Sequence, residues 1–221
     1  NGESGKTTLS YQLRTGGFLE DNNRTHGILI NEWVIENNEC SEAIKQKIEE
    51  NYEIIKNKQP ELEISIPENI RLKLWDFGGQ EYYHATHRLF LNSNVMYLLL
   101  WDKETDEQDE EKGIFPKKYW RDNIQYYTDK DKIIFEIQNK VKNSNCQSNH
   151  SNFQYKVEFR DKNDSASIQK YDLDIDDLKK GILNNLHNLN HLGSPFPKVY
   201  DDIRQVLRYL DTSYIQFAEY R

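Results

Sequence analysis

The stretch that most constrains the fold is the opening of the chain, NGESGKTTLS, at residues 1–10. Gly5, Lys6 and Thr7 form the end of a G-x-x-x-x-G-K-[ST] phosphate-binding loop, whose first glycine would fall one position before Asn1. Such a loop directs backbone N–H groups at an anion, which then sits at the N-terminus of the following helix. The motif's lysine reaches the β- and γ-phosphates, and its threonine hydroxyl binds Mg²⁺. The segment therefore predicts a nucleotide-binding loop followed by a helix.

A second segment, LWDFGGQE at residues 74–81, supports the same interpretation. An apolar strand ends in Asp76, glycines follow, and Gln80 comes next. In nucleotide hydrolases with a phosphate loop, a strand-end aspartate holds Mg²⁺ and a glutamine orients the attacking water. An ordinary turn after a strand explains the DFGG letters but does not predict the glutamine. The two motifs together favour a nucleotide hydrolase.

Helical and strand patterns alternate along the rest of the chain. This alternation predicts an α/β domain with a mostly parallel, doubly wound sheet. The strand that would carry the phosphate loop is expected to be missing from the chain. Helices are predicted at 6–16, 41–59, 117–127, 174–189 and from 198 onward, and strands at 27–36, 70–77, 94–102, 132–140 and 153–159.

Composition narrows the function classes. The 221 residues carry a formal net charge of −8, which argues against a protein that binds nucleic acid through its phosphates. Cys40 and Cys146 share no motif, so we expect reduced thiols in a cytoplasmic protein. The longest apolar run, at 95–101, is far shorter than the roughly 20 residues that span a bilayer, and no transmembrane segment is expected.

The segment 41–59 repeats apolar residues at helical spacing, with Ile44 and Ile48 among them. Ser41 is placed to cap such a helix. A solvated amphipathic insert is the favoured interpretation, and a helix that binds a partner is the alternative.

Several segments together resemble the Ras-like GTPases and, within them, the Roc (Ras of complex proteins) domain of Roco proteins, in its bacterial type. The resemblance implies a Ras-like P-loop GTPase fold at 1–192 with an insert at about 36–66, followed at 193–221 by a linker and the start of a COR domain. It also implies leucine-rich repeats elsewhere in the full protein and a homodimer formed through COR. The segments that carry it are RTHGI (24–28), WDFGGQEYYHATHRLFL (75–91), GSPFPKVYDDIRQVL (193–207) and SYIQFAEY (213–220).

The resemblance assigns roles to individual residues. Gln80 would position the attacking water, with Lys6 and Thr25 as its catalytic companions. Thr7, Thr25 and Asp76 would hold Mg²⁺. The residues that would bind GTP or GDP are Gly2, Glu3, Ser4, Gly5, Lys6, Thr7, Thr8, Gly79, Asn139 and Lys140.

The base-reading motif departs from the family pattern. Guanine-reading GTPases use Asn-Lys-x-Asp, but here Lys142 follows Asn139 and Lys140 where the aspartate is expected. A lysine cannot accept the hydrogen bonds of the guanine ring, and the neighbouring Asn143 is a poorer acceptor than a carboxylate. A slow GTPase switch is the leading hypothesis. A non-catalytic scaffold stabilised by nucleotide is the alternative, and an ATP-using enzyme is a third reading.

Two smaller features have open interpretations. Arg24 precedes Thr25 and is either a solvated loop residue or an arginine that stabilises charge in the transition state. His84 and His87 lie one helical turn apart, and packing or hydrogen bonding is favoured over a metal site, which would need more ligands.

Overall fold

The computed structural model describes residues 5–17, 19, 25, 27–61, 64–79, 87–91, 94–102, 115–128, 132–139, 152–157 and 172–194. Every helix and strand predicted within these residues is present, and the helix predicted from 198 lies outside them. The elements in chain order are α1 (Lys6–Thr15), β1 (Ile28–Glu36), η1 (Asn37–Glu39), α2 (Glu42–Lys58), β2 (Asn69–Phe77), η3 (Arg88–Phe90), β3 (Tyr97–Trp101), α4 (Lys117–Tyr127), β4 (Ile134–Gln138), β5 (Gln154–Lys156), α5 (Asp172–Asn185) and η6 (Leu186–Asn188).

The strands form two sheets. β3, β4 and β5 lie side by side and parallel, which confirms the predicted α/β class. β1 and β2 instead pair antiparallel in one uninterrupted register, from Ile28 opposite Phe77 to Glu36 opposite Asn69. The connection at 37–68 explains this difference, because it turns the chain back at the end where β1 stops, whereas parallel neighbours need a crossover.

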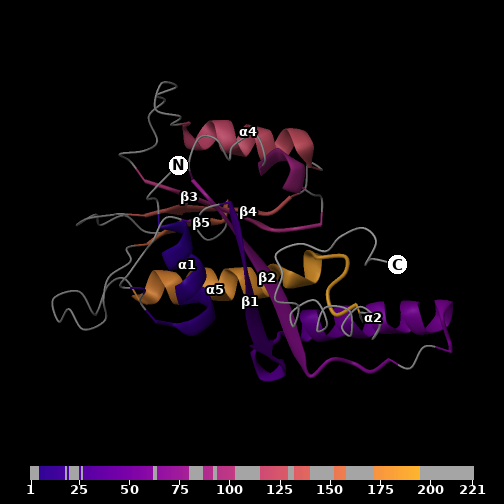
Figure 1. Ribbon diagram of the computed structural model, residues 1–221. Helices are drawn as coiled ribbons and strands as arrows, with labels where there is room; N and C mark the ends of the chain where they lie inside the picture. Colours follow the sequence, from indigo (N-terminus) through magenta and orange to yellow (C-terminus); the bar gives the residue numbers. More distant parts are fainter. Residues whose placement is uncertain are drawn as a thin grey trace, which may run out of the picture.

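Helices cover both faces of the parallel sheet. In Figure 1, α4 lies on one face, and α1 and α5 lie on the other. The core between the sheet and α5 is closely packed: a Cβ added at Gly181 of α5 would lie 2.2 Å from the Tyr155 hydroxyl oxygen of β5. Such a helix can approach the sheet this closely only through a residue without a side chain. The largest fully buried apolar side chains are Phe135, Ile35, Ile44, Ile137, Leu178, Leu186 and Val157.

A buried acid attaches α4 to the sheet. Glu136, in the middle of β4, forms ion pairs with Arg121 at 2.9 Å and with Lys117 at 3.5 Å. The Lys117 ammonium also lies 4.1 Å from the ring centroid of Trp101 on β3. These contacts hold α4 against β3 and β4.

The predicted insert is a helix, but its apolar face is not solvated. Ile44 and Ile48 of α2 are buried in the same core as Leu186 and Leu192. Ser41 occupies the N-cap position and its side chain makes no capping hydrogen bond. Cys40 is a buried thiol, and Cys146 lies outside the described residues. Among the described helices, none combines the length and the apolar character needed to cross a membrane.

Each sheet has an edge without a partner strand among the described residues. β2 pairs only with β1, and β3 pairs only with β4. The expectation that the strand before the phosphate loop is missing from the chain stays a prediction, as do the boundaries at 192/193 and the COR segment.

Candidate functional site

The site begins at the N-terminus of α1. Gly5 is the N-cap residue, with a φ of 89° in the left-handed region that glycine adopts without strain. Its carbonyl accepts the N–H of Leu9 at 2.9 Å, which starts the helix. Lys6, Thr7 and Thr8 therefore occupy the first turn, and the N-terminal end of a helix attracts anions. Gly2, Glu3 and Ser4 lie outside the described residues.

Three residues that are far apart in the sequence meet beside this helix terminus. Thr7 lies in α1, Thr25 precedes β1, and Asp76 lies near the end of β2. The Thr7 hydroxyl donates to Asp76 Oδ2 at 2.6 Å, and the Thr25 hydroxyl donates to the same oxygen at 3.3 Å. The two hydroxyl oxygens lie 2.8 Å apart. These are the residues predicted as magnesium ligands, and the fold brings all of them together.

The electrostatics of Asp76 are suited to a bound cation. Asp76 is only 5% exposed, and its Oδ1 is buried with no hydrogen-bond partner among the described residues. Burial raises the pKa of Asp76, against the opposing effects of the Thr7 hydrogen bond, the Lys6 charge and the Thr25 hydrogen bond. A buried carboxylate and hydroxyl oxygens are the hard ligands that Mg²⁺ prefers. The residues present therefore fit this ion.

Lys6 shares the buried environment of Asp76. Burial lowers the pKa of Lys6, and the nearby Asp76 carboxylate partly opposes this by raising it. A cation held in a partly dry site exerts a stronger field on a ligand than one in bulk water. The described residues contain no cluster of three or more His, Cys, Asp or Glu side chains for a metal, so the candidate metal site depends on the threonine hydroxyls.

The glycines after β2 continue the ladder beyond the paired strands. The Gly78 N–H donates to the Gly27 carbonyl at 2.8 Å, so the segments after Thr25 and after Asp76 are joined side by side. Gly79 is the next residue in the sequence after Gly78. Gln80 and Arg24 lie outside the described residues, so their roles stay predictions.

The base-reading side is partly described. Asn139 directly follows β4, is buried, and donates its N–H to the Trp101 carbonyl at 2.8 Å. This bond places Asp102, fully buried after β3, at the same end of the sheet. Asp102 was not predicted as a site residue, although it ends an apolar run in the same way as Asp76. Lys140, Lys142 and Asn143 lie outside the described residues.

Aromatic side chains lie where the segment after β2 rejoins the described chain. The His87 ring packs edge-on against Phe77 at 4.9 Å between centroids and lies 5.6 Å from Trp120 of α4. This agrees with a packing role for His87, and His84 lies outside the described residues. Phe90 remains partly exposed and packs 5.5 Å from Trp75.

A phosphate-loop helix, a strand-end aspartate and a parallel sheet with helices on both faces define the class, a Ras-like P-loop domain. Comparison with known proteins shows which family within this class the chain is similar to. Residues 50–142 match the family model described as Roc, Ras of Complex, the Roc domain of DAPkinase. Over these residues the chain is similar to the Roc family.

Two curated proteins are similar to parts of the chain. The chain is 33% identical over 109 residues to the probable serine/threonine-protein kinase pats1 of Dictyostelium discoideum, covering 48% of this chain and 3% of that protein. It is 28% identical over 65 residues to the probable serine/threonine-protein kinase roco5 of the same organism, covering 29% of this chain and 2% of that protein. The chain thus spans a small fraction of either relative.

A solved structure shares the fold. The structure of Methanosarcina barkeri Roco2 RocCORdC bound to GDP superposes with a TM-score of 0.59 and 22% sequence identity. The match covers all of this chain and 57% of that one. At this identity the likeness supports the Ras-like fold alone.

Proposed function

We propose that this Roc domain binds GTP and GDP with Mg²⁺ and slowly hydrolyses GTP, acting as a conformational switch within a multidomain Roco protein. The observation that carries the proposal is the meeting of Thr7, Thr25 and Asp76 at the N-terminus of α1. A buried acid, two partly buried hydroxyls and a lysine gather at one helix terminus. A bound Mg²⁺–nucleotide would account for this grouping.

The residues of the site would divide the work as follows. Thr7, Thr25 and Asp76 would hold Mg²⁺, and a bound Mg²⁺ would neutralise charge on the phosphates. Lys6 and the N–H groups of the first turn of α1 would bind the β- and γ-phosphates. Thr25 belongs to the segment before β1, so a ligand that engages its hydroxyl would order that segment. Loss of the ligand would release it, which is how switch loops work in this class.

Hydrolysis would depend on Gln80. Its amide is placed in sequence to orient water for attack on the γ-phosphate, and Lys6 would stabilise the charge that develops. Gln80→Leu should lower single-turnover GTP hydrolysis by at least about tenfold with nucleotide affinity unchanged. Unchanged hydrolysis in Gln80→Leu would refute this assignment. Arg24→Ala tests the arginine-finger hypothesis by the same assay.

Guanine specificity is the second part of the proposal. Asn139 is buried at the sheet end where a base would bind, and Lys140 follows it in the sequence. The archaeal Roco2 structure is described as bound to GDP, which supports guanine nucleotide as the ligand class. Lys142 favours the alternative, a scaffold that nucleotide stabilises without strong base discrimination.

The wider assembly is also a proposal. Within the full protein we expect the Roc domain to contact a COR domain after residue 193, to be linked to leucine-rich repeats, and to form a homodimer through COR. A cytoplasmic setting and a role in signalling follow from the same resemblance.

Titration calorimetry on the full-length protein tests the function. GDP, GTP, ADP and ATP are compared with and without Mg²⁺, in wild type, Thr7→Val and the matched control Thr15→Val. Thr15 lies in the same helix, and its hydroxyl donates to the Tyr11 carbonyl instead of to the site. The proposal expects guanine nucleotides to bind at least about tenfold tighter than adenine nucleotides, a difference of about 1.4 kcal/mol. It also expects Thr7→Val alone to remove the effect of Mg²⁺. Equal binding of all four nucleotides would support the scaffold.

A further inference from the structure

The connection between β1 and β2 reaches across the molecule to the last described turn. Figure 1 shows α2 lying beside the turn that follows η6. Ile48 is buried against this turn, and a Cβ added at Gly193 would lie 2.6 Å from its Cγ1 atom. Gly193 also has a φ of 66°, in the left-handed region. The turn is therefore shaped to fit the surface of α2. We call residues 189–194 the exit turn.

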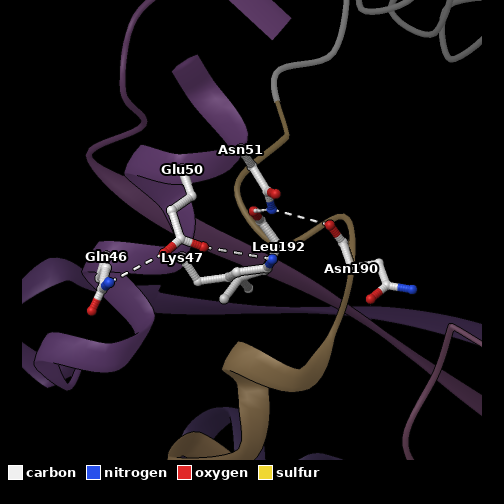
Figure 2. A network of polar contacts seen from close by, with 6 residues as sticks. All are labelled: Gln46, Lys47, Glu50, Asn51, Asn190 and Leu192. Carbon is white, nitrogen blue, oxygen red and sulfur yellow. Dashed lines mark hydrogen bonds and ion pairs between the residues drawn. The ribbon is translucent and has the colours of Figure 1, made fainter. Parts of the chain in front are cut away.

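A buried amide on α2 binds the exit turn directly. The Asn51 side chain is 7% exposed, and its Nδ2 donates to the carbonyls of Leu192 at 2.7 Å and Asn190 at 3.1 Å. Figure 2 shows this amide pointing at both carbonyls, with Lys47 and Glu50 forming a separate ion pair beside it. A buried amide that satisfies two backbone acceptors specifies one geometry, since any shift leaves polar groups unpaired.

The exit turn is also held from its other side. The Asn190 N–H donates to the Asn94 side-chain oxygen at 2.9 Å. Asn94 lies between η3 and β3, in the part of the chain that follows the WDFGGQE motif. A further bridge, from Lys179 of α5 to Glu39 of η1 at 3.1 Å, joins the start of the insert to the helix that leads into the turn.

The opposite end of the same elements carries the candidate magnesium site. β1 begins just after Thr25, and β2 contains Asp76. Between the site and the insert the two strands are paired at every position, over a length of about 30 Å. The β1–β2 ladder therefore joins the magnesium end to the insert without a break in its pairing.

We propose that α2 is a coupling clamp: it transmits the state of the magnesium end, through the β1–β2 ladder, to the exit turn and so to the chain beyond Ser194. The ligand dependence of this coupling rests on the proposed function. Coupling is reciprocal, so releasing the exit turn must alter the magnesium end. Residues 37–58 thereby gain a role that the amphipathic pattern alone does not indicate.

Asn51→Asp tests the clamp with the least change in volume. An aspartate places a second oxygen against two carbonyl oxygens and cannot donate when ionised. The matched control is Glu53→Gln, an exposed position two residues further along α2. Amide hydrogen exchange is measured in the full-length protein at two places. The local reporters are Asn190, Leu192 and Ser194, and the distant reporter is Gly78, whose N–H closes the ladder at the magnesium end.

The clamp predicts faster exchange by about tenfold at the exit turn in Asn51→Asp, since buried hydrogen bonds are lost. It also predicts faster exchange at Gly78, and a fall of at least about fivefold in GDP affinity, within the usual range of coupling between sites. Glu53→Gln should match wild type throughout. Faster exchange at the exit turn with Gly78 unchanged would overturn the coupling, and so would no change at either place.

Two features keep the test decisive. Should Asn51→Asp fail to fold, Gly193→Ala attacks the same contact from the turn, because its Cβ clashes with Ile48, and the same expectations apply. The Gly78 measurement needs no nucleotide. A protein that binds no nucleotide would therefore refute the proposed function, while exchange at Gly78 would still decide the clamp.

Discussion

At the scale of single residues, Asp76 shows a conflict between stability and binding. Its carboxylate is buried, one of its oxygens has no hydrogen-bond partner within the described part of the chain, and burial raises its pKa. An ionised group in such a place destabilises the ligand-free fold. A bound cation would stabilise the same carboxylate strongly, because the group is buried. Asp76 is therefore better suited to the bound state than to the empty one.

Asp76→Asn tests this conflict. An asparagine keeps an acceptor for the hydroxyls of Thr7 and Thr25 but carries no charge. We expect the free energy of unfolding without ligand, measured by urea denaturation, to equal or exceed that of wild type. We expect the Mg²⁺ dependence of nucleotide binding to disappear. A loss of more than about 3 kcal/mol in the ligand-free protein would show that the carboxylate itself stabilises the fold.

The pKa of Glu39 is shifted downward, in the opposite direction to that of Asp76. A hydrogen bond from Lys179 lowers the pKa of Glu39, partly opposed by burial, so the folded state favours the ionised form. The stabilisation is fully present above the ordinary glutamate pKa of about 4.3 and disappears as pH falls through the lowered value. Both side chains are about one-third exposed, at 35% and 34%, so the contribution at neutral pH is at most about 1 kcal/mol.

Urea denaturation of Glu39→Gln across pH checks this. The difference from wild type should be present at pH 7 and should vanish under acid conditions in which Glu39 is protonated in both states. Glu49→Gln, at an exposed position of α2, is the control and should show no such trend. A difference that grows as pH falls would contradict the assignment.

At the scale of elements, the sequence predicted the individual helices and strands better than it predicted which elements pack against each other. The glycine at position 16 predicted the end of α1, and the apolar alternation of 70–77 predicted β2, within a residue of its actual start. Spacing also identified the apolar face of α2. It could not say what covers that face, because Asn51 reads as an ordinary polar residue until the exit turn is in place. The antiparallel pairing of β1 with β2 could not be predicted either, because it depends on the path of the insert between them.

The packing of α2 can be measured with a matched pair of substitutions. Ile44→Ala removes a fully buried side chain and should lower the free energy of unfolding by about 2–5 kcal/mol. Ile54→Ala makes the same chemical change in the same helix, at a position that is 49% exposed. It should stay within about 0.5 kcal/mol of wild type. Equal effects in the two variants would mean that the apolar face of α2 is not buried in solution.

The attachment of α4 depends on charge. Glu136→Gln keeps the shape of the side chain but removes its ion pairs with Arg121 and Lys117, and we expect a loss of about 1–3 kcal/mol. Asp122→Asn breaks the exposed pair with Lys118 on the same helix and should change stability by less than about 0.5 kcal/mol. Thermal denaturation of both variants compares the two sites.

At the scale of the whole molecule, the candidate site is built from segments that no single element contains. The sequence predicted Thr7, Thr25 and Asp76 because each lies in a recognisable motif, and in the fold the three side chains lie together. Asp102 ends an apolar run as Asp76 does, but it lies in no recognisable motif, and it was not predicted. Gln80 remains a prediction from sequence alone.

Ligand linkage gives a test on this scale. Mg²⁺–GDP at about one hundred times its dissociation constant should raise the free energy of unfolding by about 2.7 kcal/mol, since only the folded state binds it. Removing Mg²⁺ with EDTA should abolish most of this gain in wild type. In Asp76→Asn the chelator should have no effect. A gain that is insensitive to EDTA would mean that the ion plays no part in binding.

The strand edges that have no partner among the described residues have a consequence for the isolated polypeptide. An open strand edge is a template on which another chain can add a strand, and charged side chains are the usual protection against this. β2 carries Arg71 and Lys73, but β3, with the sequence YLLLW, carries no charge at all. Where nothing else covers it, β3 is the edge at which copies of this domain would stack and aggregate.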